Sequence, residues 1–171
     1  NILIYDEAGD HTAMQSAEIA IQGGSTVEFM TPDRLISSEI MGMNLTPYIK
    51  NLQNKKITYS IAKRLLDVSI KDNKLNALIG SDYDEKFKHN STYDQIILNY
   101  GVKPLDELYF NLVPHSKNEG EVNYDKFIKG EQQNIIKNKN NKFNLYRIGD
   151  AISSRNIHAA IYDALRLVIN L

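Results

Sequence analysis

The sequence predicts an α/β fold in which a parallel sheet carries flanking helices and an inserted antiparallel β-meander. Three observations predict it. An apolar run at residues 2–5 is followed by a turn, a helical pattern and a second apolar run, which is the order of a βαβ unit. Apolar residues alternate between positions 64 and 79, as is typical of antiparallel strands. Near the C-terminal end, a strand pattern leads into a long amphipathic helix.

The first thirty residues carry the βαβ pattern. Residues 2–5 are a short apolar run of the kind that forms a buried strand, and residues 6–10 form the turn after it. Gly23 and Gly24 are a stop signal for the helix that follows, and residues 26–30 are the second strand. The two strands should be parallel, because a helical crossover returns the chain in the same direction. The helix should bury one face, made of Ala13, Met14, Ala17, Ala20 and Ile21.

The middle of the chain predicts a helix and then a group of strands. Thr46 and Pro47 are typical of the N-cap and first residue of a helix, which we expect to end near Asn54. Three strand-like runs should form the antiparallel meander: residues 57–61, 64–71 and 75–79. The second of these runs should present one apolar face, made of Leu66, Val68 and Ile70.

The following part of the chain is polar, with shorter signals. Residues 81–92 should form a loop, and residues 93–100 contain another apolar strand. A short helix is expected at residues 105–112. The stretch from 114 to 142 is rich in Asn and Lys, so it should be a surface excursion with one turn of helix near 124–128.

The C-terminal end gives the strongest local signal. Residues 143–148 are typical of a strand, Gly149 and Asp150 turn the chain, and a helix is expected from residue 155 to residue 171. Its apolar stripe is regular and should pack on a sheet: Ile157, Ala160, Ile161, Ala164, Leu165, Val168 and Leu171.

The composition excludes several classes of protein. The chain has 171 residues and a net charge of -1, so no basic excess favours nucleic acid or anionic membranes as partners. It has no cysteine, which excludes thiolate metal ligands and an iron–sulfur cluster held by this chain. No apolar run approaches the ~20 residues of a membrane span, and we expect a cytoplasmic protein. Because Asn1 leads directly into a strand, we also expect an excised segment of a longer polypeptide.

The turn at residues 6–10 lies where a dinucleotide-binding fold places its glycine-rich loop. A complete G-x-G-x-x-G there lets backbone N–H groups and the helix N-terminus bind a pyrophosphate. Only Gly9 is present, and Asp6, Glu7 and Asp10 place negative charges where the anion would lie. Two such charges about 4 Å apart repel each other by ~1 kcal/mol in water. The turn therefore argues against NAD(P) binding and favours a structural remnant over a working cofactor site.

The histidines form no recognisable catalytic or metal-binding motif. His11 lies beside the acidic turn, and its simplest interpretation is a solvated residue at the helix start. A metal site made from Asp6, Asp10 and His11 is the alternative, but no second cluster supports it. The other histidines are scattered: His89, His115 and His158. No G-x-S-x-G or Walker motif occurs, which argues against hydrolase and P-loop functions.

Gly149 and Asp150 are a more informative pair, because they lie between an expected strand and a long helix. A carboxylate there can accept hydrogen bonds from ribose or ribityl hydroxyls, and the helix N-terminus offers N–H donors to a phosphate or an electron-rich ring. Arg155 adds a cation at the same end of the helix. Gly-Asp is also a common turn pair, so the binding and structural interpretations both stay open.

Four stretches together resemble one family; they lie at residues 5–11, 27–32, 98–104 and 146–151. The chain is similar to the C-terminal dinucleotide-binding region of the iron–sulfur flavoproteins built on an old-yellow-enzyme barrel. That family includes 2,4-dienoyl-CoA reductase, trimethylamine dehydrogenase and the N-methylproline (stachydrine-type) demethylases. The acidic turn and the ending at residues 155–167 are most similar to the demethylases.

The resemblance implies where cofactors lie. In that family an upstream barrel holds FMN and substrate, and a cysteine cluster holds a 4Fe–4S centre, both outside this chain. Gly149 and Asp150 match the motif that contacts the flavin or ADP, while Gly9 matches the NAD(P) loop without its other glycines. The resemblance divides the chain into a Rossmann-like, NAD(P)-binding-type domain (1–112), a surface excursion (113–142) and the strand–turn–helix of an FAD- or ADP-binding-type domain (143–171).

These inferences predict a segment of an FMN/iron–sulfur oxidoreductase, an amine dehydrogenase or demethylase, that is not catalytic by itself. Gly149, Asp150, Arg155 and Gly9 are the candidate cofactor-binding residues, and FAD or ADP is the expected nucleotide. The expected partners are the upstream barrel domain of the same polypeptide and an electron-carrier protein. Two alternatives stay open: a functional NAD(P)H-binding domain, and a nucleotide-free interaction module that docks the barrel or the electron carrier.

Overall fold

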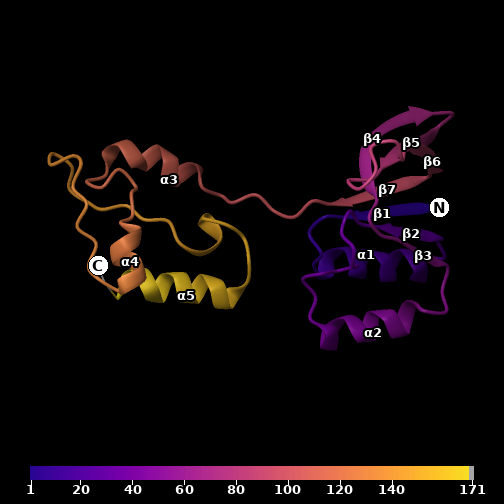
Figure 1. The fold of residues 1–171 in the computed structure, drawn as a ribbon, viewed down its shortest axis with the longest axis horizontal. Coiled ribbons are helices and arrows are strands. Elements are labelled where there is room, and N and C mark those ends of the chain that lie inside the picture. The colour runs from indigo at the N-terminus through magenta and orange to yellow at the C-terminus, as the bar shows by residue number, and fades with distance from the viewer. Residues whose placement is uncertain (170–171) are drawn as a thin grey trace. The chain divides into compact units, whose positions relative to one another are not determined.

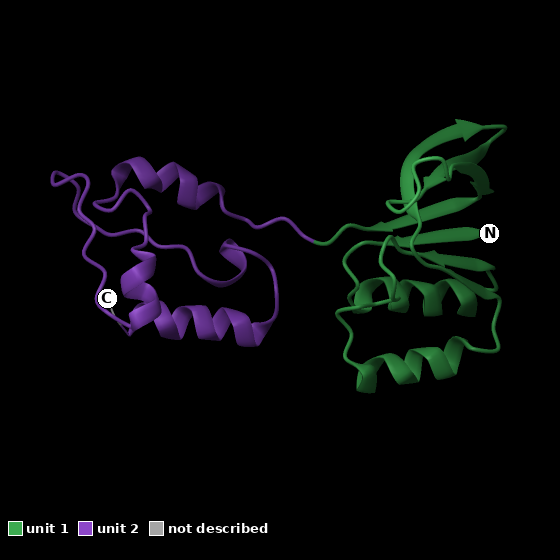
Figure 2. Ribbon diagram, in the orientation of Figure 1, with its two compact units in different colours: residues 1–101 green, residues 102–171 purple. Residues whose placement is uncertain are grey.

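The computed structural model describes residues 1–169, and within them the chain forms two compact units (Figure 2). The first unit extends from Asn1 to Gly101 and the second begins at Val102. The sequence-based division was placed after residue 112, whereas helix α3 (Glu107–Leu112) lies in the second unit. The assignment of the parts to particular cofactor-binding domains stays a prediction.

The first unit is built on a parallel four-stranded sheet with the order β3-β2-β1-β7 (Figure 1). Its strands are β1 (Ile2–Asp6), β2 (Val27–Met30), β3 (Ile57–Ser60) and β7 (Gln95–Asn99). In the central strand β1, Ile4 lies opposite Phe29 of β2 and Ile97 of β7. All five residues of β1 are buried, as is typical of a parallel strand covered on both faces. The predicted parallel βαβ unit is confirmed.

Two helices, α1 (His11–Gln22) and α2 (Gly42–Leu52), cover one face of this sheet (Figure 1). The predicted inner face of α1 is confirmed, because Ala13, Met14 and Ala17 are buried and pack in one cluster with the sheet. Each helix joins two parallel strands, β1 to β2 and then β2 to β3. The crossovers therefore set the common direction of these three strands.

Helix α2 begins earlier than the sequence predicts. It starts at Gly42 and not at Pro47, which lies inside the helix. The first turn forms upstream, where the N–H groups of Asn44 and Leu45 donate to the carbonyl of Met41. Pro47 has no N–H, so one helical hydrogen bond is missing at this point, yet the helix continues through it to Leu52. The predicted N-cap residue Thr46 instead donates its hydroxyl to the Gly42 carbonyl at 2.8 Å.

A three-stranded antiparallel sheet covers the other face of the parallel sheet. Its order is β4 (Arg64–Lys71), β5 (Lys74–Gly80) and β6 (His89–Tyr93). A second buried cluster joins the two sheets, with Leu3, Tyr5 and Met30 from the parallel sheet and Leu65, Ala77, Ile79 and Tyr93 from the antiparallel one. The predicted α/β fold with an inserted meander is confirmed.

The strands that form the meander differ from the predicted ones. Residues 57–60 form β3 and pair parallel with β2, since α2 acts as a second crossover. The third strand of the meander is β6, which lies mostly within the predicted loop 81–92. Its residues before Tyr93 are polar, and none of them is buried. A hydrophobic pattern cannot reveal such a strand.

A β-bulge changes the predicted apolar face of β4. Register shifts between Leu65 and Asp67, so Leu65 lies opposite Ile79 while Val68 lies opposite Ala77. A bulge adds one residue to a strand and thereby shifts its alternation. Leu65 therefore joins the buried cluster, and Leu66, which the sequence placed on the inner face, is 44% exposed.

The described part of the second unit is made of helices and irregular segments. Its elements are α3 (Glu107–Leu112), the 3-10 helix η1 (Val113–His115), α4 (Tyr124–Lys129), the 3-10 helix η2 (Gly149–Ala151) and α5 (Ile157–Val168). The short helices predicted at 105–112 and 124–128 are confirmed.

The predicted strand at residues 143–148 is wrong: no strand forms there. The segment is extended, but the buried side chain of Asn118 takes the place of a neighbouring strand. Asn118 accepts a hydrogen bond from the backbone N–H of Leu145 and donates to the Leu145 carbonyl, each at 2.8 Å. A single amide thus satisfies both backbone groups of one residue, and no sheet is needed.

Helix α5 is shorter than predicted, and the described large apolar side chains of its predicted stripe are exposed. It begins at Ile157 after the N-cap Asn156 and ends at Val168; Leu171 of the predicted stripe lies outside the described residues. Ile157 is 77% exposed and Ile161 is 61% exposed, so the predicted packing on a sheet is wrong for the described part of the chain. The second unit has no strand among these residues for the stripe to cover.

Helices long and apolar enough to cross a bilayer do not occur among residues 1–169.

Candidate functional site

The turn between β1 and α1 lies at the carboxyl edge of the parallel sheet, where open α/β sheets bind ligands. Asp6 is the last residue of β1, and its Oδ1 accepts a hydrogen bond from the backbone N–H of Gly9 at 3.0 Å. Gly9 has a φ of 68°, which glycine adopts without strain. Asp10 caps α1, because its Oδ1 accepts from the Thr12 N–H at 2.9 Å. The turn is closed by its own carboxylates.

Asn99, at the end of β7, completes this closure. Its side-chain nitrogen donates to Asp6 Oδ1 and to Asp10 Oδ1, both at 2.9 Å. Its backbone carbonyl accepts from the N–H groups of Glu7 and Ala8. The sequence pattern does not single out Asn99, although the parallel pairing of β1 with β7 places it directly opposite Asp6. A polar residue ending an apolar strand was the available signal.

The two acids of the turn have different environments. Burial raises the pKa of Asp6 above its usual value near 3.8, and hydrogen bonds from Gly9 and Asn99 only partly oppose this. Its Oδ2 is buried without a hydrogen-bond partner in the described part of the chain. Partial burial also acts to raise the pKa of Asp10, but hydrogen bonds from Thr12 and Asn99 outweigh it, so that pKa is lowered.

Residues 34–39, which we call the strap, cover Gly9 from outside. The N–H of Glu39 donates to the Gly9 carbonyl at 3.1 Å. A Cβ added to Gly9 would lie 2.7 Å from Ser38 Oγ and 3.1 Å from the Ser38 backbone nitrogen. The strap therefore fills the space through which a pyrophosphate would approach the Gly9 backbone.

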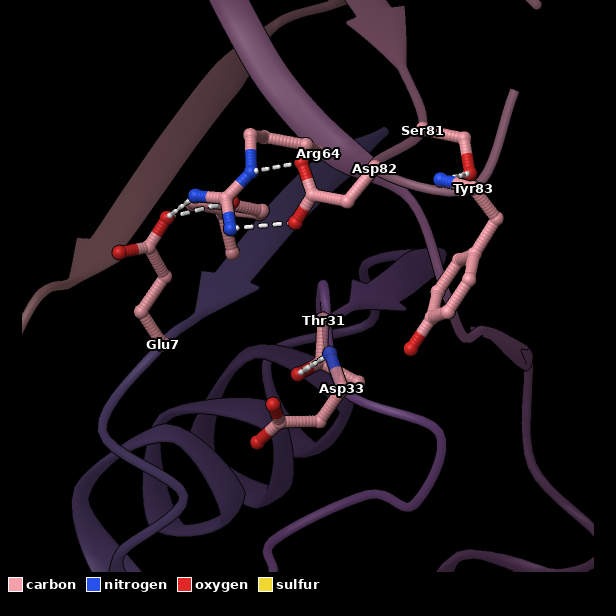
Figure 3. A network of polar contacts seen from close by, with 8 residues as sticks. Glu7, Thr31, Asp33, Arg64, Ser81, Asp82 and Tyr83 are labelled. Carbon is pink, nitrogen blue, oxygen red and sulfur yellow. Dashed lines mark hydrogen bonds and ion pairs between the residues drawn. The ribbon is translucent and has the colours of Figure 1, made fainter. Parts of the chain in front are cut away.

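One cation near this edge, Arg64, is also engaged. Arg64 of β4 lies between Glu7 and Asp82 (Figure 3). Its Nε and Nη2 donate to the two Asp82 oxygens at 2.7 and 2.6 Å, and its Nη1 donates to Glu7 Oε1 at 2.8 Å. Tyr5 donates its hydroxyl to the same Glu7 oxygen. This fork-like geometry leaves Arg64 as a link between the two sheets rather than a phosphate ligand.

The alternative metal site of Asp6, Asp10 and His11 does not form. The two aspartates share Asn99, whereas His11 Nδ1 lies 3.1 Å from the hydroxyl of Tyr48 on α2. Across the described residues, no group of three or more His, Cys, Asp or Glu side chains could hold a metal ion.

The second candidate turn, at Gly149, is held by contacts with residues of α5. Gly149 is buried with a φ of 56°, and a Cβ there would lie 3.1 Å from the Cβ of Ala160. Its N–H donates to Asp163 Oδ2 at 3.3 Å. Arg155 forms an ion pair with the same Asp163 oxygen, so it holds the turn against α5. Asp150 is exposed and has no hydrogen bond or ion pair with the described residues.

A cavity of about 770 Å³ lies in the second unit beside this turn. Its wall includes Tyr109, Phe127, Arg147 and Arg155. Both arginines are already neutralised, since Arg147 pairs with Asp106 at 2.6 Å and Arg155 pairs with Asp163. The Arg147 guanidinium also lies 4.9 Å from the centre of the Tyr109 ring, within cation–π range.

The chain is similar to three curated proteins over nearly its whole length. It is 51% identical over 168 residues to the "Probable N-methylproline demethylase" of Rhizobium meliloti, covering 98% of this chain and 25% of that protein. It is 29% identical to the N,N-dimethylglycine/sarcosine dehydrogenase of Chromohalobacter salexigens, covering 98% and 24%. It is 26% identical to the multifunctional alkene reductase/demethylase OYE of Caballeronia cordobensis, covering 100% and 26%. The chain spans about a quarter of the length of these relatives.

Solved structures share the fold at low identity. The 6-hydroxypseudooxynicotine amine oxidase of Pseudomonas geniculata matches with a TM-score of 0.63 and 18% identity, over 95% of this chain and 20% of that chain. Thioredoxin reductase of Lactococcus lactis matches with a TM-score of 0.60 and 16% identity, over 96% and 49%. At these identities the likeness shows the fold alone. No protein-family model matches the chain.

The parallel sheet, its crossover helices and its turns define a Rossmann-like α/β fold, which the thioredoxin reductase structure shares. More particularly, the chain is homologous to a quarter of the N-methylproline demethylase, N,N-dimethylglycine/sarcosine dehydrogenase and OYE-type reductase/demethylase relatives. The resemblance that the sequence predicted, with the demethylases foremost, is confirmed.

Proposed function

We propose that this chain is a nucleotide-recognition and packing segment of a larger FMN/iron–sulfur oxidoreductase, an amine dehydrogenase or demethylase, and that it makes and breaks no substrate bond itself. The 51% identity to the demethylase relative supports the parent class. FMN and a 4Fe–4S cluster would lie in other parts of that polypeptide. This chain has no cysteine and therefore supplies no thiolate ligand to such a cluster.

The observation that carries the proposal is the contrast between the two glycine turns. At Gly9, the chain's own groups occupy the position of an anion: Asp6 and Asp10 are bridged by Asn99, and the strap lies on the glycine. At Gly149 the turn is held by a hydrogen bond to Asp163, while the carboxylate of Asp150 is exposed to solvent. Nucleotide contact is therefore assigned to the second turn.

The groups at the second turn fit an FAD or ADP nucleotide. An ionised aspartate only accepts hydrogen bonds, so Asp150 suits the hydroxyls of a ribose or ribityl chain. Asn156 caps α5 by accepting the N–H of Ala159, and a helix N-terminus favours a phosphate or an electron-rich ring. Arg155 acts in this proposal by holding Asp163 and the turn in place, because its charge is already paired.

Packing is the second part of the proposed role. The exposed apolar side chains on α5 are Ile157, Ile161, Leu165 and Val168. A row of this kind marks a contact surface, and we assign it to the rest of the parent polypeptide, with the barrel domain as partner. The same face favours the second candidate function, a nucleotide-free module that docks the barrel or an electron-carrier protein. The nucleotide content of the parent protein distinguishes the two.

The deciding experiment compares three forms of the full-length parent protein: wild type, Asp150→Ala and the control Asp125→Ala. Asp125 is exposed on α4 in the same unit. Asp150→Ala should weaken FAD or ADP retention by about 1.5–3 kcal/mol, the scale of a hydrogen bond to a charged group, and the control should retain nucleotide like wild type. Equal content in all three forms, or none in any, supports the interaction module.

Two assays on the isolated chain test the rest of the proposal. Purified flavin-free chain should show no turnover of methylated amines with an artificial electron acceptor, and measurable turnover would overturn the non-catalytic role. Calorimetry with NADH and NADPH should give a Kd above ~1 mM, corresponding to less than about 4 kcal/mol. Micromolar affinity would instead establish the alternative of a functional NAD(P)H-binding domain.

A further inference from the structure

The strap is fastened at both of its ends. Before it, the carbonyl of Asp33 accepts the N–H of Ala62, and the N–H of Asp33 donates to Thr31 Oγ1 at 3.2 Å. After it, Ile40 is buried in the core cluster beneath α1 and α2. Movement of the strap is therefore confined to residues 34–39.

Few contacts hold the middle of the strap to the turn beneath it. One backbone hydrogen bond, from the Glu39 N–H to the Gly9 carbonyl, crosses between them. Ser38 adds a hydrogen bond to Asp33 at 3.3 Å, which lies within the strap's own anchor. Leu35 is 71% exposed and lines a shallow hollow of about 520 Å³ with Asp33, Arg34 and Ser38. Leu35 thus contributes little to the core, whereas its neighbour Ile36 is half-buried and packs against the core cluster.

In the closed strap, the backbone conformation and the buried hydroxyl of Ser37 are both unfavourable. Its φ is 50°, in the left-handed region that a residue with a Cβ rarely adopts. Its side chain is 2% exposed, and its Oγ has no hydrogen-bond partner in the described part of the chain. A buried hydroxyl without a partner loses its hydration and gains nothing in return. Both features would be relieved if Ser37 turned toward water.

We propose that the strap is a built-in gate that opens at Ser37 while the rest of the first unit stays folded. Opening breaks the Glu39–Gly9 hydrogen bond, relaxes the Ser37 backbone and hydrates its hydroxyl. It uncovers Gly9, which is buried under the closed strap. Opening requires no ligand, so it is independent of which nucleotide the parent protein binds.

Amide hydrogen exchange of the full chain, followed by NMR, tests this gate. The Glu39 amide reports strap opening directly, because it donates to the Gly9 carbonyl, which lies outside the strap. The Ile4 amide in the central strand reports opening of the whole unit. Glu39 should exchange roughly 100-fold faster than Ile4, as expected of a local opening. Equal protection of the two amides would show that the strap opens only with the fold, and the proposal would be wrong.

The variant Ser37→Gly provides a second test of the gate. Glycine adopts a φ of 50° without strain and has no hydroxyl, so the closed strap is favoured and Glu39 exchange should slow about tenfold. Asn73→Gly is the matched control, since Asn73 has a similar φ of 58° on the exposed turn between β4 and β5. It should leave Glu39 exchange unchanged. Unchanged or faster exchange in Ser37→Gly contradicts the gate.

Discussion

Asn99 lies opposite Asp6 in the pairing of β7 with β1, and its side-chain amide donates a hydrogen bond to the Asp6 carboxylate at 2.9 Å. The same nitrogen reaches Asp10, so one neutral side chain holds two acids together at the sheet edge. Asp6 is nevertheless buried with one oxygen unpaired. This combination makes Asp6 costly to ionise in the folded chain.

Stability should depend on pH through Asp6. Burial raises the pKa of Asp6 in the folded state, so the folded chain keeps this proton at pH values where the unfolded chain has lost it. The free energy of unfolding should therefore fall as pH rises from the ordinary value near 3.8 through the raised folded pKa. Asp6→Asn should remove this part of the fall. Urea unfolding of both proteins from about pH 4 to pH 8 measures it.

Asp72→Asn is the control for this experiment, because Asp72 is exposed on the turn between β4 and β5. It should leave the pH dependence of unfolding as in wild type. If Asp6→Asn and wild type give parallel curves, Asp6 does not carry the proposed proton.

Gly149→Ala should destabilise the second unit. The φ of 56° disfavours any residue with a Cβ, and the new methyl group would lie 3.1 Å from the Cβ of Ala160. A left-handed alanine costs about 1–2 kcal/mol, and denaturant unfolding should show at least that loss. Gly42→Ala, a helical position with open space around it, should cost nothing. Equal stability of the two variants would contradict the packing of Gly149 on α5.

Asn118→Ala tests the side chain that replaces a strand. The substitution leaves the N–H and carbonyl of Leu145 and the carbonyl of Glu121 without their partner. Glu121 is exposed, so water can replace its partner, and the two Leu145 groups carry the loss. At about 1–3 kcal/mol for each unpaired group, unfolding should become easier by about 2–6 kcal/mol overall. Asn144→Ala, an exposed neighbour, should be neutral within ~0.5 kcal/mol. A neutral Asn118→Ala would mean that water replaces the amide fully.

A charge introduced on α5 should affect the stability of the chain differently on the two faces of the helix. Ile161 is 61% exposed and Leu167 is 4% exposed. In this chain, Ile161→Asp should change the free energy of unfolding by less than ~0.5 kcal/mol, whereas Leu167→Asp should cost about 3–5 kcal/mol by burying an unpaired charge. Thermal unfolding compares them. A large loss in Ile161→Asp would show that its face is covered within the chain itself.

Patterns that arise within one element were predictable from the sequence. The β1–α1–β2 unit rests on local apolar spacing and glycine stops, and its helix buries the expected Ala13, Met14 and Ala17. The turns at Gly9 and Gly149 were found because glycine and aspartate have strong local preferences. Both glycines have positive φ.

Features that depend on a distant partner were not predictable. The extended run before Gly149 has the composition of a strand, but its partner is the side chain of Asn118, 27 residues away from Leu145. β6 was missed because its residues before Tyr93 are all polar, and the inner face of β4 was misplaced by a bulge. At the candidate site, Asn99 acts on Asp6 through pairing of strands 93 residues apart.

That last separation bears on how the chain is made. β1 is synthesised before the other three strands of its sheet and lies between two of them, yet its neighbour β7 is complete only after a further 93 residues, from Glu7 to Asn99, have been added. Until then, the edge of β1 that later pairs with β7 has no partner strand, and the residues along it from Ile2 to Tyr5 are apolar. Unpaired apolar strand edges associate with other chains during synthesis. The unpaired edge of β1 should therefore be prone to such association until β7 has been made.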